Sequence, residues 1–513
     1  MPDTPPESPL PEGASPDSER EEFERLKPRL AALWTDGVPE DKPYTSVVIP
    51  SLSLDPAELR KLRGPSFYEE RLLFLMIRLR NPRARLVYVT SQPIHDRVVD
   101  YYLHLLSGIP ASHARRRLTL LAAYDSSLVP LSEKVLLRPR LMQRIRDVIP
   151  DPQQAYLTVF NSTLLERRLA VRLGIPLNAV DPELGHHGSK SGGRRVFKEA
   201  GVAFPDGVED VRSVEDLVDG LVALRQRCPE LTHAIVKLND SFSGEGNAVF
   251  RYPEGTDREA VRDALHDLRF SAEEENSEHF LDQLSHMGGV VEERIEGIDV
   301  RSPSVQLRIN PRGQVFVSST HEQVLGGPTG QTYLGCRFPA QEYYRSDLET
   351  NAQRIAQVLA EKGVVSRFSV DFIAFRRVMG GPWTTRALEI NLRMGGTTHP
   401  MFALRFLTGG RVDDKSGFHS ETGVPKYYRA TDDLYSEAYR GLVPDDLLEI
   451  FTLNRLAYDP VSETGILYHM IGAVSQYGKL GLVAIGNTPE QADALFERTV
   501  AVLDREAHFI SPS

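Results

Sequence analysis

Apolar and polar positions follow two different periods in the first third of the chain. Short runs rich in β-branched and aromatic residues predict four strands, at 46–51, 85–91, 117–124 and 154–160. Between them, apolar residues recur at helical spacing over 67–80 and 94–106. A further helical segment, 132–149, contains Pro139 and is expected to kink or split there. Strands alternating with helices predict parallel βαβ units in an open sheet, whose ligands bind beyond the carboxyl ends of the strands.

The pattern changes after about residue 186. Strand-like runs and glycine-rich turns replace the alternation, and no long helix is expected between 286 and 340. The polar region 406–440 predicts a long loop, and it is followed by a strand at 479–486 and a helix at 489–507. Neither a GxGxxG fingerprint after a strand nor a GxxxxGK[ST] loop occurs in the first domain, so a dinucleotide-binding Rossmann or Walker-type site is not supported.

Composition narrows the class of protein. Residues 1–40 are acidic and proline-rich and predict a disordered tail rather than a signal or transit peptide. The 513 residues contain 71 Asp and Glu against 60 Lys and Arg, a net charge of −11, which argues against a general nucleic-acid binder. Apolar runs are too short to span a bilayer. Cys228 and Cys336 are too few for a disulfide framework, so we expect a cytoplasmic protein with no membrane or nucleic-acid partner.

The most informative pattern is a predicted strand pair at 368–375 and 387–393. Alternation places Glu389, Asn391 and Arg393 on one face of the second strand, and pairing brings Asp371 of the first strand close to them. Two carboxylates and an amide oxygen are hard donors of the kind that Mg²⁺ prefers. Arg393 is suited to bind a phosphoryl or carboxylate group with two hydrogen bonds. For 387–393 taken alone, a half-solvated strand is the commoner interpretation.

Two further segments favour a nucleotide ligand. Lys237 lies inside an apolar run and needs an anionic partner, and the glycine-rich segment 241–247 follows it directly. A plain hairpin turn is the alternative for that segment. In 288–300, an extended backbone and the side chains of Glu292, Glu293, Ile295 and Asp299 are placed to hold adenine and ribose. An amphipathic edge strand is the alternative there.

These motifs, in this order, resemble the ATP-grasp superfamily of carboxylate–amine ligases, and most of 45–510 is similar to the pheganomycin-type peptide ligases of antibiotic biosynthesis. The resemblance implies an α/β fold, α+β in the grasp region, with domains at 41–185 (Rossmann-like, pre-ATP-grasp), 186–405 (ATP-grasp, two α+β subdomains) and 406–513 (C-terminal loop and αβ segment). The D-alanine ligase branch ends its metal motif differently from EINLRMGGTTHP, which argues against a D-amino-acid substrate.

The resemblance also implies roles for residues. Asp371, Glu389 and Asn391 would bind Mg²⁺, or Mn²⁺ in its place, and Arg393 and Arg308 would act on the transferred group. The nucleotide contacts implied are Lys190, Lys237, Ser243, Gly244, Gly246, Glu292, Glu293, Ile295 and Asp299. A carboxylate would attack ATP to give an acyl phosphate and ADP, and an amino-acid or peptide amine would then displace phosphate.

The sequence leaves alternatives open. One is a nucleotide-binding regulatory protein that kept the fold without turnover, and another is a kinase-like use of the same site. The two small-molecule substrates and the oligomeric state, including a homodimer, also stay open. So do the roles of Cys336, His186, His187 and His321, while His469 is expected to be a buried core histidine.

Overall fold

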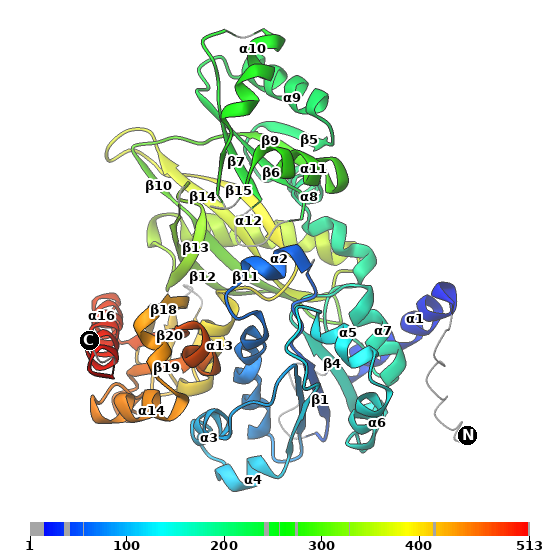
Figure 1. Ribbon diagram of the computed structural model, residues 1–513, viewed down its shortest axis with the longest axis vertical. Helices are drawn as coiled ribbons and strands as arrows, with labels where there is room; N and C mark the ends of the chain where they lie inside the picture. Colours follow the sequence, from blue (N-terminus) through cyan, green and yellow to red (C-terminus); the bar gives the residue numbers. More distant parts are fainter. Residues whose placement is uncertain are drawn as a thin grey trace.

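Sheets of four, five and nine strands organise the computed structural model (Figure 1). It describes residues 15–34, 42–54, 56–240, 246–255, 257–271, 275–327, 329–413 and 417–510. The predicted mixed α/β class is confirmed. None of the helices in these described ranges is long and apolar enough to cross a membrane.

The N-terminal lobe is built on the parallel sheet β3-β2-β1-β4. Its strands are β1 (Thr45–Ile49), β2 (Arg85–Thr90), β3 (Leu118–Ala122) and β4 (Ala155–Val159), as predicted. The connecting helices include η1 (Pro65–Arg80), a 3₁₀ helix buried along most of its length, α3 (Asp96–His104) and α7 (Leu164–Leu173). The predicted break at Pro139 is confirmed, because α5 (Leu131–Leu136) ends before it and α6 (Pro139–Asp147) begins at it.

The prediction of a disordered tail over residues 1–40 is wrong for 15–34. Residues Pro16–Leu33 form helix α1, capped by the Ser15 side chain, which accepts a hydrogen bond from the backbone N–H of Ser18. Phe23 and Leu26 lie on one face of this helix and pack into the core of the N-terminal lobe. The apolar spacing of this face offsets the cost of ordering that the acidic, proline-rich composition suggested.

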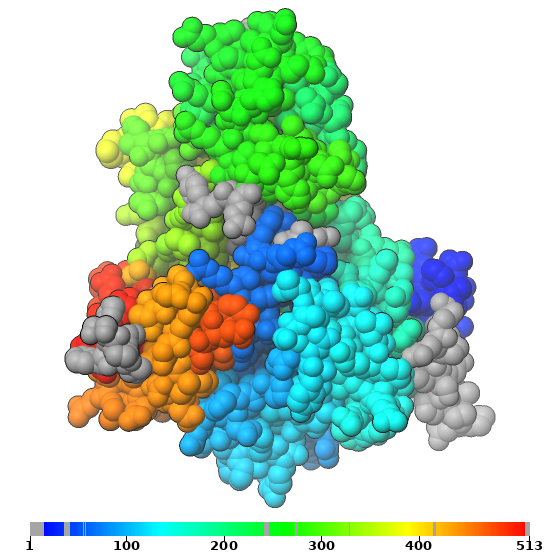
Figure 2. Space-filling model, viewed as in Figure 1, coloured from blue at the N-terminus to red at the C-terminus, as the bar shows by residue number. Residues whose placement is uncertain are grey.

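A separate lobe, green in Figures 1 and 2, forms the top of the molecule in this view, with blue residues of the N-terminal lobe against its lower edge. Its antiparallel sheet has the order β5-β9-β6-β7-β8. The strands are β5 (Gly207–Val211), β6 (His233–Leu238), β7 (Asn247–Arg251), β8 (Arg269–Phe270) and β9 (Gly289–Glu293). Helices α9 (Val214–Arg227), α10 (Arg258–Asp263) and α11 (Ser277–Met287) contribute apolar side chains to its core.

The nine-stranded sheet connects this lobe to the C-terminal segment. Its order is β10-β14-β11-β12-β13-β18-β20-β19, and β15 pairs with β14. The strands are β10 (Asp299–Arg301), β11 (Pro303–Ile309), β12 (Val315–Gly326), β13 (Thr332–Phe338), β14 (Ser366–Arg376), β15 (Thr384–Asn391), β18 (Tyr427–Tyr435), β19 (Gly465–His469) and β20 (Lys479–Gly486). Helices α12 (Glu342–Glu361), α13 (Thr398–Thr408), α14 (Pro444–Leu453) and α16 (Pro489–Ile510) pack on it or beside it.

One expectation for this region is wrong. The segment 406–440 is not a long loop, because β18 within it pairs with both β13 and β20. Its polar residues alternate with buried Tyr428 and Ala430, so the strand has one face in the core. The strand at 479–486 and the helix that follows it are confirmed.

Candidate active site

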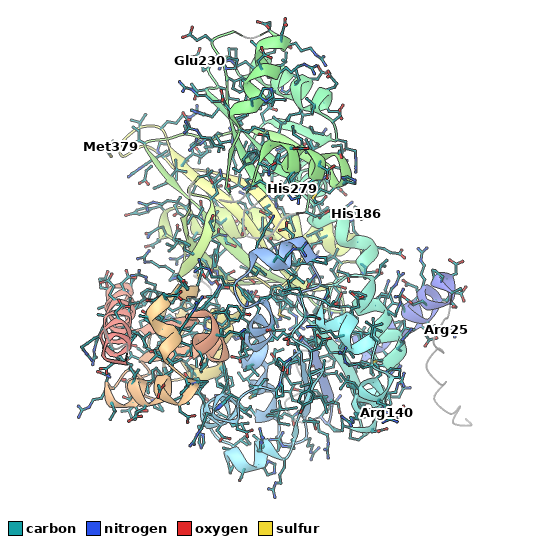
Figure 3. The ribbon with its side chains drawn as sticks, viewed as in Figure 1. Arg25, Arg140, His186, Glu230, His279 and Met379 are labelled. Carbon is teal, nitrogen blue, oxygen red and sulfur yellow. The ribbon has the colours of Figure 1, made fainter. Side chains whose placement is uncertain are left out.

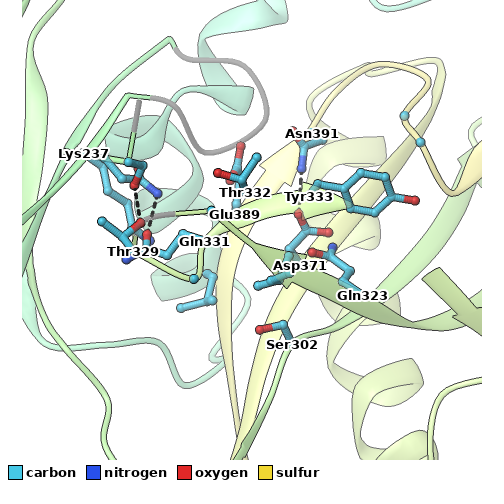
Figure 4. Close-up of a pocket in the computed structure, with 18 of the residues that line it drawn as sticks. Lys237, Ser302, Gln323, Thr329, Gln331, Thr332, Tyr333, Asp371, Glu389 and Asn391 are labelled. Atoms are coloured by element: carbon cyan, nitrogen blue, oxygen red, sulfur yellow. Dashed lines mark hydrogen bonds between the residues drawn. The ribbon is translucent and has the colours of Figure 1, made fainter. Parts of the chain in front are cut away.

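A cleft of about 1480 Å³ runs between the green lobe, the nine-stranded sheet and the N-terminal lobe. Lys237 and Glu292 line it from the five-stranded sheet, and Asp371 and Asn391 line it from the hairpin of β14 and β15. Figure 4 shows Asp371 and Asn391 joined by a hydrogen bond, with Glu389 near them and Lys237 on the opposite side.

The hairpin register explains why these side chains meet. Asp371 of β14 lies opposite Glu389 of β15, and Ser369 lies opposite Asn391. Asn391 Nδ2 donates to Asp371 Oδ2 at 3.0 Å, and Ser304 Oγ of β11 donates to Asp371 Oδ1 at 2.6 Å. Cross-strand pairing therefore places two carboxylates and an amide on one surface, as the alternation of the sequence predicted.

Helix α8 (Lys190–Glu199) brings a lysine to the same carboxylates. Lys190 Nζ lies 2.5 Å from Glu389 Oε1, and its side chain is buried. The start of this helix is glycine-rich because it packs closely: a Cβ on Gly192 would lie 1.9 Å from the carbonyl oxygen of His186. Gly188 and Gly193 similarly face Leu392 and Ile390, so small residues let α8 approach β15.

The electrostatics of the hairpin favour a bound cation. Burial and the charge of Glu389 raise the pKa of Asp371 above its usual value. Burial would also raise the pKa of Glu389, but Lys190, Lys237 and Arg393 outweigh it and lower that pKa. Two close carboxylates repel, and a cation between them stabilises both in the charged form. This donor set therefore fits Mg²⁺, whose remaining ligands are commonly water and phosphate oxygens.

The donor set is small. Within the described residues, no group of three or more His, Cys, Asp or Glu side chains is arranged to hold a metal ion. The hairpin supplies two carboxylates and one amide oxygen instead. Such a set suits a cation that arrives with a phosphorylated ligand rather than one held by protein side chains alone.

Lys237 occupies the opposite wall of the cleft. Its ammonium group forms an ion pair with Glu292, which is 2% exposed and also accepts from Arg194 Nη1 at 3.3 Å. The strand pairing of β6 with β9 sets this contact, because Ile235 lies opposite Glu292 and Lys237 follows two residues later on the same face. A buried lysine with one carboxylate partner can exchange that partner for a phosphate oxygen.

The remaining predicted site residues differ in where they lie. Glu293, Ile295 and Arg393 line the cleft, and the nearby carboxylates of Glu389 and Asp371 oppose the lowering of the Arg393 pKa by burial. Gly246 accepts a hydrogen bond from the Leu238 backbone N–H. Ser243 and Gly244 lie outside the described residues.

Asp299 and Arg308 do not line the cleft. Asp299 is bound by Arg376 and Arg301, each at 3.0 Å. Arg308 lies four residues beyond Ser304 on β11, a rise of about 13 Å along the strand, and reaches a different cavity. The role at the transferred group was implied for Arg308 by the family resemblance, and the structure places its side chain at this other cavity instead.

Sequence reasoning missed the far end of the cleft. There Arg71 of η1 pairs with Asp432 at 3.2 Å, and Lys479 pairs with Asp433 at 2.8 Å and donates to the Tyr68 hydroxyl at 2.7 Å. Burial by itself lowers the pKa of Lys479, but Tyr68 and the two aspartates outweigh it and raise that pKa. These residues come from three distant segments and form no motif, so their burial beside opposite charges was visible only in the structure.

The histidines left open do not enter the cleft. His186 lies exposed just before α8 (Figure 3), and His187 stacks beside it. His321 is buried against the Tyr428 hydroxyl. His469 is buried and lies 3.1 Å from His399, which confirms that it is a core histidine.

Comparisons with known proteins give the family. Residues 182–253 and 266–415 match the sequence profile described as IQCH-like, ATP-grasp, and 446–499 match the PGM1 C-terminal domain. The L-propargylglycine–L-glutamate ligase of Streptantibioticus cattleyicolor is 31% identical over 477 residues, which cover 90% of this chain and 95% of that protein. The chain belongs to the ATP-grasp family. It is an ATP-dependent ligase that joins a carboxylate to an amine.

One further sequence relative matches the chain, and solved structures share its fold. IQ motif-containing protein H of Danio rerio is 22% identical over 95% of this chain, which spans half of that protein. Biotin carboxylase of Campylobacter jejuni superposes with a TM-score of 0.55 at 12% identity and covers 91% of this chain and 95% of that one. An N5-carboxyaminoimidazole ribonucleotide synthetase solved with ADP superposes with a TM-score of 0.52 at 12% identity. The match covers 90% of this chain and 97% of that one.

Proposed function

We propose that the chain activates the carboxylate of one amino acid with ATP and joins it to the amine of a second amino acid or short peptide. The observation that carries this proposal is the continuity of the cleft. One end has an oxygen-donor set and two lysines, and the other has paired charges of both signs. A relative named for joining two amino acids supports the same substrate class.

At the nucleotide end, Asp371, Glu389 and Asn391 would hold Mg²⁺, and Mn²⁺ would be an acceptable substitute because it also prefers oxygen donors. When bound there, the cation would supply neutralisation of phosphate charge and polarisation of the transferred group. Lys190 and Lys237 exchange their carboxylate partners for phosphate oxygens, and Glu293 and Ile295 lie beside the base. Asp299 is left out of this assignment because two arginines already bind its carboxylate.

The reaction runs in two balanced steps. A carboxylate oxygen attacks the γ-phosphorus of ATP, the bond to the β,γ-bridging oxygen breaks, and ADP leaves. The amine then attacks the acyl carbon, the bond to the phosphate oxygen breaks, and the amine loses a proton as the amide forms. Arg393 lies beside the carboxylate pair and stabilises the charge of the transferred group.

At the acceptor end, the protein has charged groups opposite in sign to the two charged groups of an amino acid. Arg71 and Lys479 suit a carboxylate, whereas Asp432 and Asp433 suit an ammonium group. A substrate carrying both groups can replace the internal ion pairs without leaving a buried charge unpaired. This feature favours free amino acids or the ends of short peptides over simple amines.

The test is a product screen by mass spectrometry with ATP, Mg²⁺, pooled amino acids and short peptides. We expect an amide together with equal amounts of ADP and phosphate, formed only when both substrates are present. Hydroxylamine added in place of the amine should trap the acyl phosphate as a hydroxamate. A stable phosphorylated product without an amide, or ATP binding without any turnover, would contradict the proposal.

A further inference from the structure

A second cavity of about 100 Å³ lies behind the cleft. It is lined by Trp34 of α1, by η1, by the residues after β4, by the ends of β11 and β14 that face the N-terminal lobe, and by α13. Its volume is several times what one buried water needs. The position beyond the carboxyl end of β4 is where an open parallel sheet places its ligands.

Three arginines meet at this cavity. Arg308 of β11 is the register partner of Arg367 of β14, so their side chains leave the same face of the sheet side by side. Arg78 of η1 lines the cavity from the opposite lobe. All three side chains are half-buried. Like charges directly opposite each other on neighbouring strands are destabilising, so this arrangement calls for a compensating anion.

The compensating charge does not come from the described part of the protein. Among those residues, no Asp or Glu forms an ion pair with Arg78, Arg308 or Arg367. Arg308 lies over the Trp34 ring at 3.9 Å and Arg367 over the Phe402 ring at 4.6 Å. Arg78 donates to the hydroxyls of Ser46 and Thr158.

The surroundings of these arginines also indicate a missing anion. Burial lowers the pKa of Arg308 to about 10, aided by Arg78 and Arg405. Burial and the neighbouring arginines lower the pKa of Arg367 as well. Ser162, at the same cavity, has a buried hydroxyl with no hydrogen-bond partner. A buried hydroxyl with no partner beside uncompensated guanidinium groups indicates a missing acceptor.

We propose that the cavity formed by Arg78, Arg308, Arg367 and Ser162 binds a small oxyanion, either inorganic phosphate or a carboxylate, at a site separate from the nucleotide cleft. Guanidinium groups bind such anions with paired hydrogen bonds. Arg393 and Phe160 line both this cavity and the cleft, so the bound anion lies directly behind the reacting centre. This inference does not depend on which amino acids the enzyme joins.

Calorimetry on the wild-type protein tests the proposal directly. The cleft is first filled with Mg²⁺ and a non-hydrolysable ATP analogue, and phosphate, sulfate, glutamate and succinate are then titrated separately at constant ionic strength. We expect one saturable site for at least one of these anions. Phosphate and sulfate binding alone would identify a phosphate site, whereas glutamate or succinate binding alone would identify a carboxylate site. No saturable binding by any of the four would overturn the proposal.

Variants locate the site. Arg367→Gln and Arg308→Gln should each weaken anion binding about tenfold or more, because each removes a charge-assisted hydrogen bond. The matched control is Arg377→Gln, which alters an exposed arginine just after β14. Lys237→Gln, measured without nucleotide, separates the two sites. Binding that survives Arg367→Gln and is lost in Lys237→Gln would place the anion in the cleft and overturn the proposal.

Discussion

Positively charged side chains have different kinds of partner in the two cavities. In the cleft, Lys190, Lys237, Arg71 and Lys479 each lie against a carboxylate of the protein. In the smaller cavity, the arginines lie against aromatic rings, hydroxyl groups and one another. The two cavities have Arg393 and Phe160 in common, so this contrast occurs across a single wall.

The difference indicates two modes of ligand use. Ion pairs within the protein keep the cleft neutral when no substrate is bound. When a substrate binds, each of its charged groups replaces one side-chain partner in such a pair. A cavity with only cations is stable when its anion stays bound, because the protein offers no replacement. Variants should therefore have opposite effects on stability in the two places.

The largest expected effect is on turnover, from Glu389→Gln. This change keeps the size of the side chain but removes a cation ligand and the partner of Lys190, so kcat/KM should fall about 10³-fold, or about 4 kcal/mol. ADP release measures the loss, and circular dichroism checks the fold. Glu230→Gln is the control, since Glu230 is exposed and lies far from the cleft (Figure 3). Equal activity in the two variants would reject the assignment of Glu389.

The next effect is on stability, from Arg71→Met. It leaves the buried carboxylate of Asp432 without its partner, and the free energy of unfolding should fall by about 3 kcal/mol. Urea denaturation measures the change. Adding Asp432→Leu should restore part of the loss, because the double variant has no unpaired charge. A double variant that is less stable than Arg71→Met would show that Arg71 and Asp432 do not stabilise the fold as an ion pair.

A smaller effect is expected from Ser304→Ala. The change removes the hydrogen bond that fixes one oxygen of Asp371, and the activation free energy of the reaction should rise by about 1 kcal/mol. Activity should fall severalfold while the urea midpoint hardly moves. A rise in the Mg²⁺ concentration needed for half-maximal rate would distinguish loose positioning of Asp371 from simple unfolding. An unchanged Mg²⁺ requirement would mean that Ser304 does not position a cation ligand.

The smallest effect has the opposite sign. Arg367→Met removes one of two like charges that face each other, so in chloride buffer without oxyanions the free energy of unfolding should rise by about 0.5 kcal/mol. Urea titrations of this variant and of Arg377→Met as a control provide the measurement. A loss of stability in chloride buffer would show that the arginines are compensated by the protein itself and that the contrast between the cavities is false.

Local pattern predicted the hairpin because strand alternation and a glycine turn fix which side chains meet. Asp371, Glu389 and Asn391 needed no information from distant segments. The acceptor end required Tyr68, Asp432 and Lys479 to come together from three regions, and no spacing along the chain encodes that. The position of Arg308 was equally hidden, because the resemblance named its strand but not the cavity that its side chain lines.

The helix at residues 16–33 shows the other limit. The acidic, proline-rich composition of this region led to a prediction of disorder. The spacing of Phe23, Leu26 and Leu30 is nevertheless helical, and these residues form the buried face of the helix. The predicted residue roles and domain limits stay predictions.

Helix α1 has a practical consequence that follows from Trp34. Its indole ring lies 3.9 Å from the guanidinium group of Arg308, and Trp34 directly follows α1 as its C-terminal cap. A truncated enzyme beginning at residue 42 would expose that guanidinium group to bulk solvent. We expect such a shortened protein to bind the proposed anion more weakly than the protein that retains Trp34.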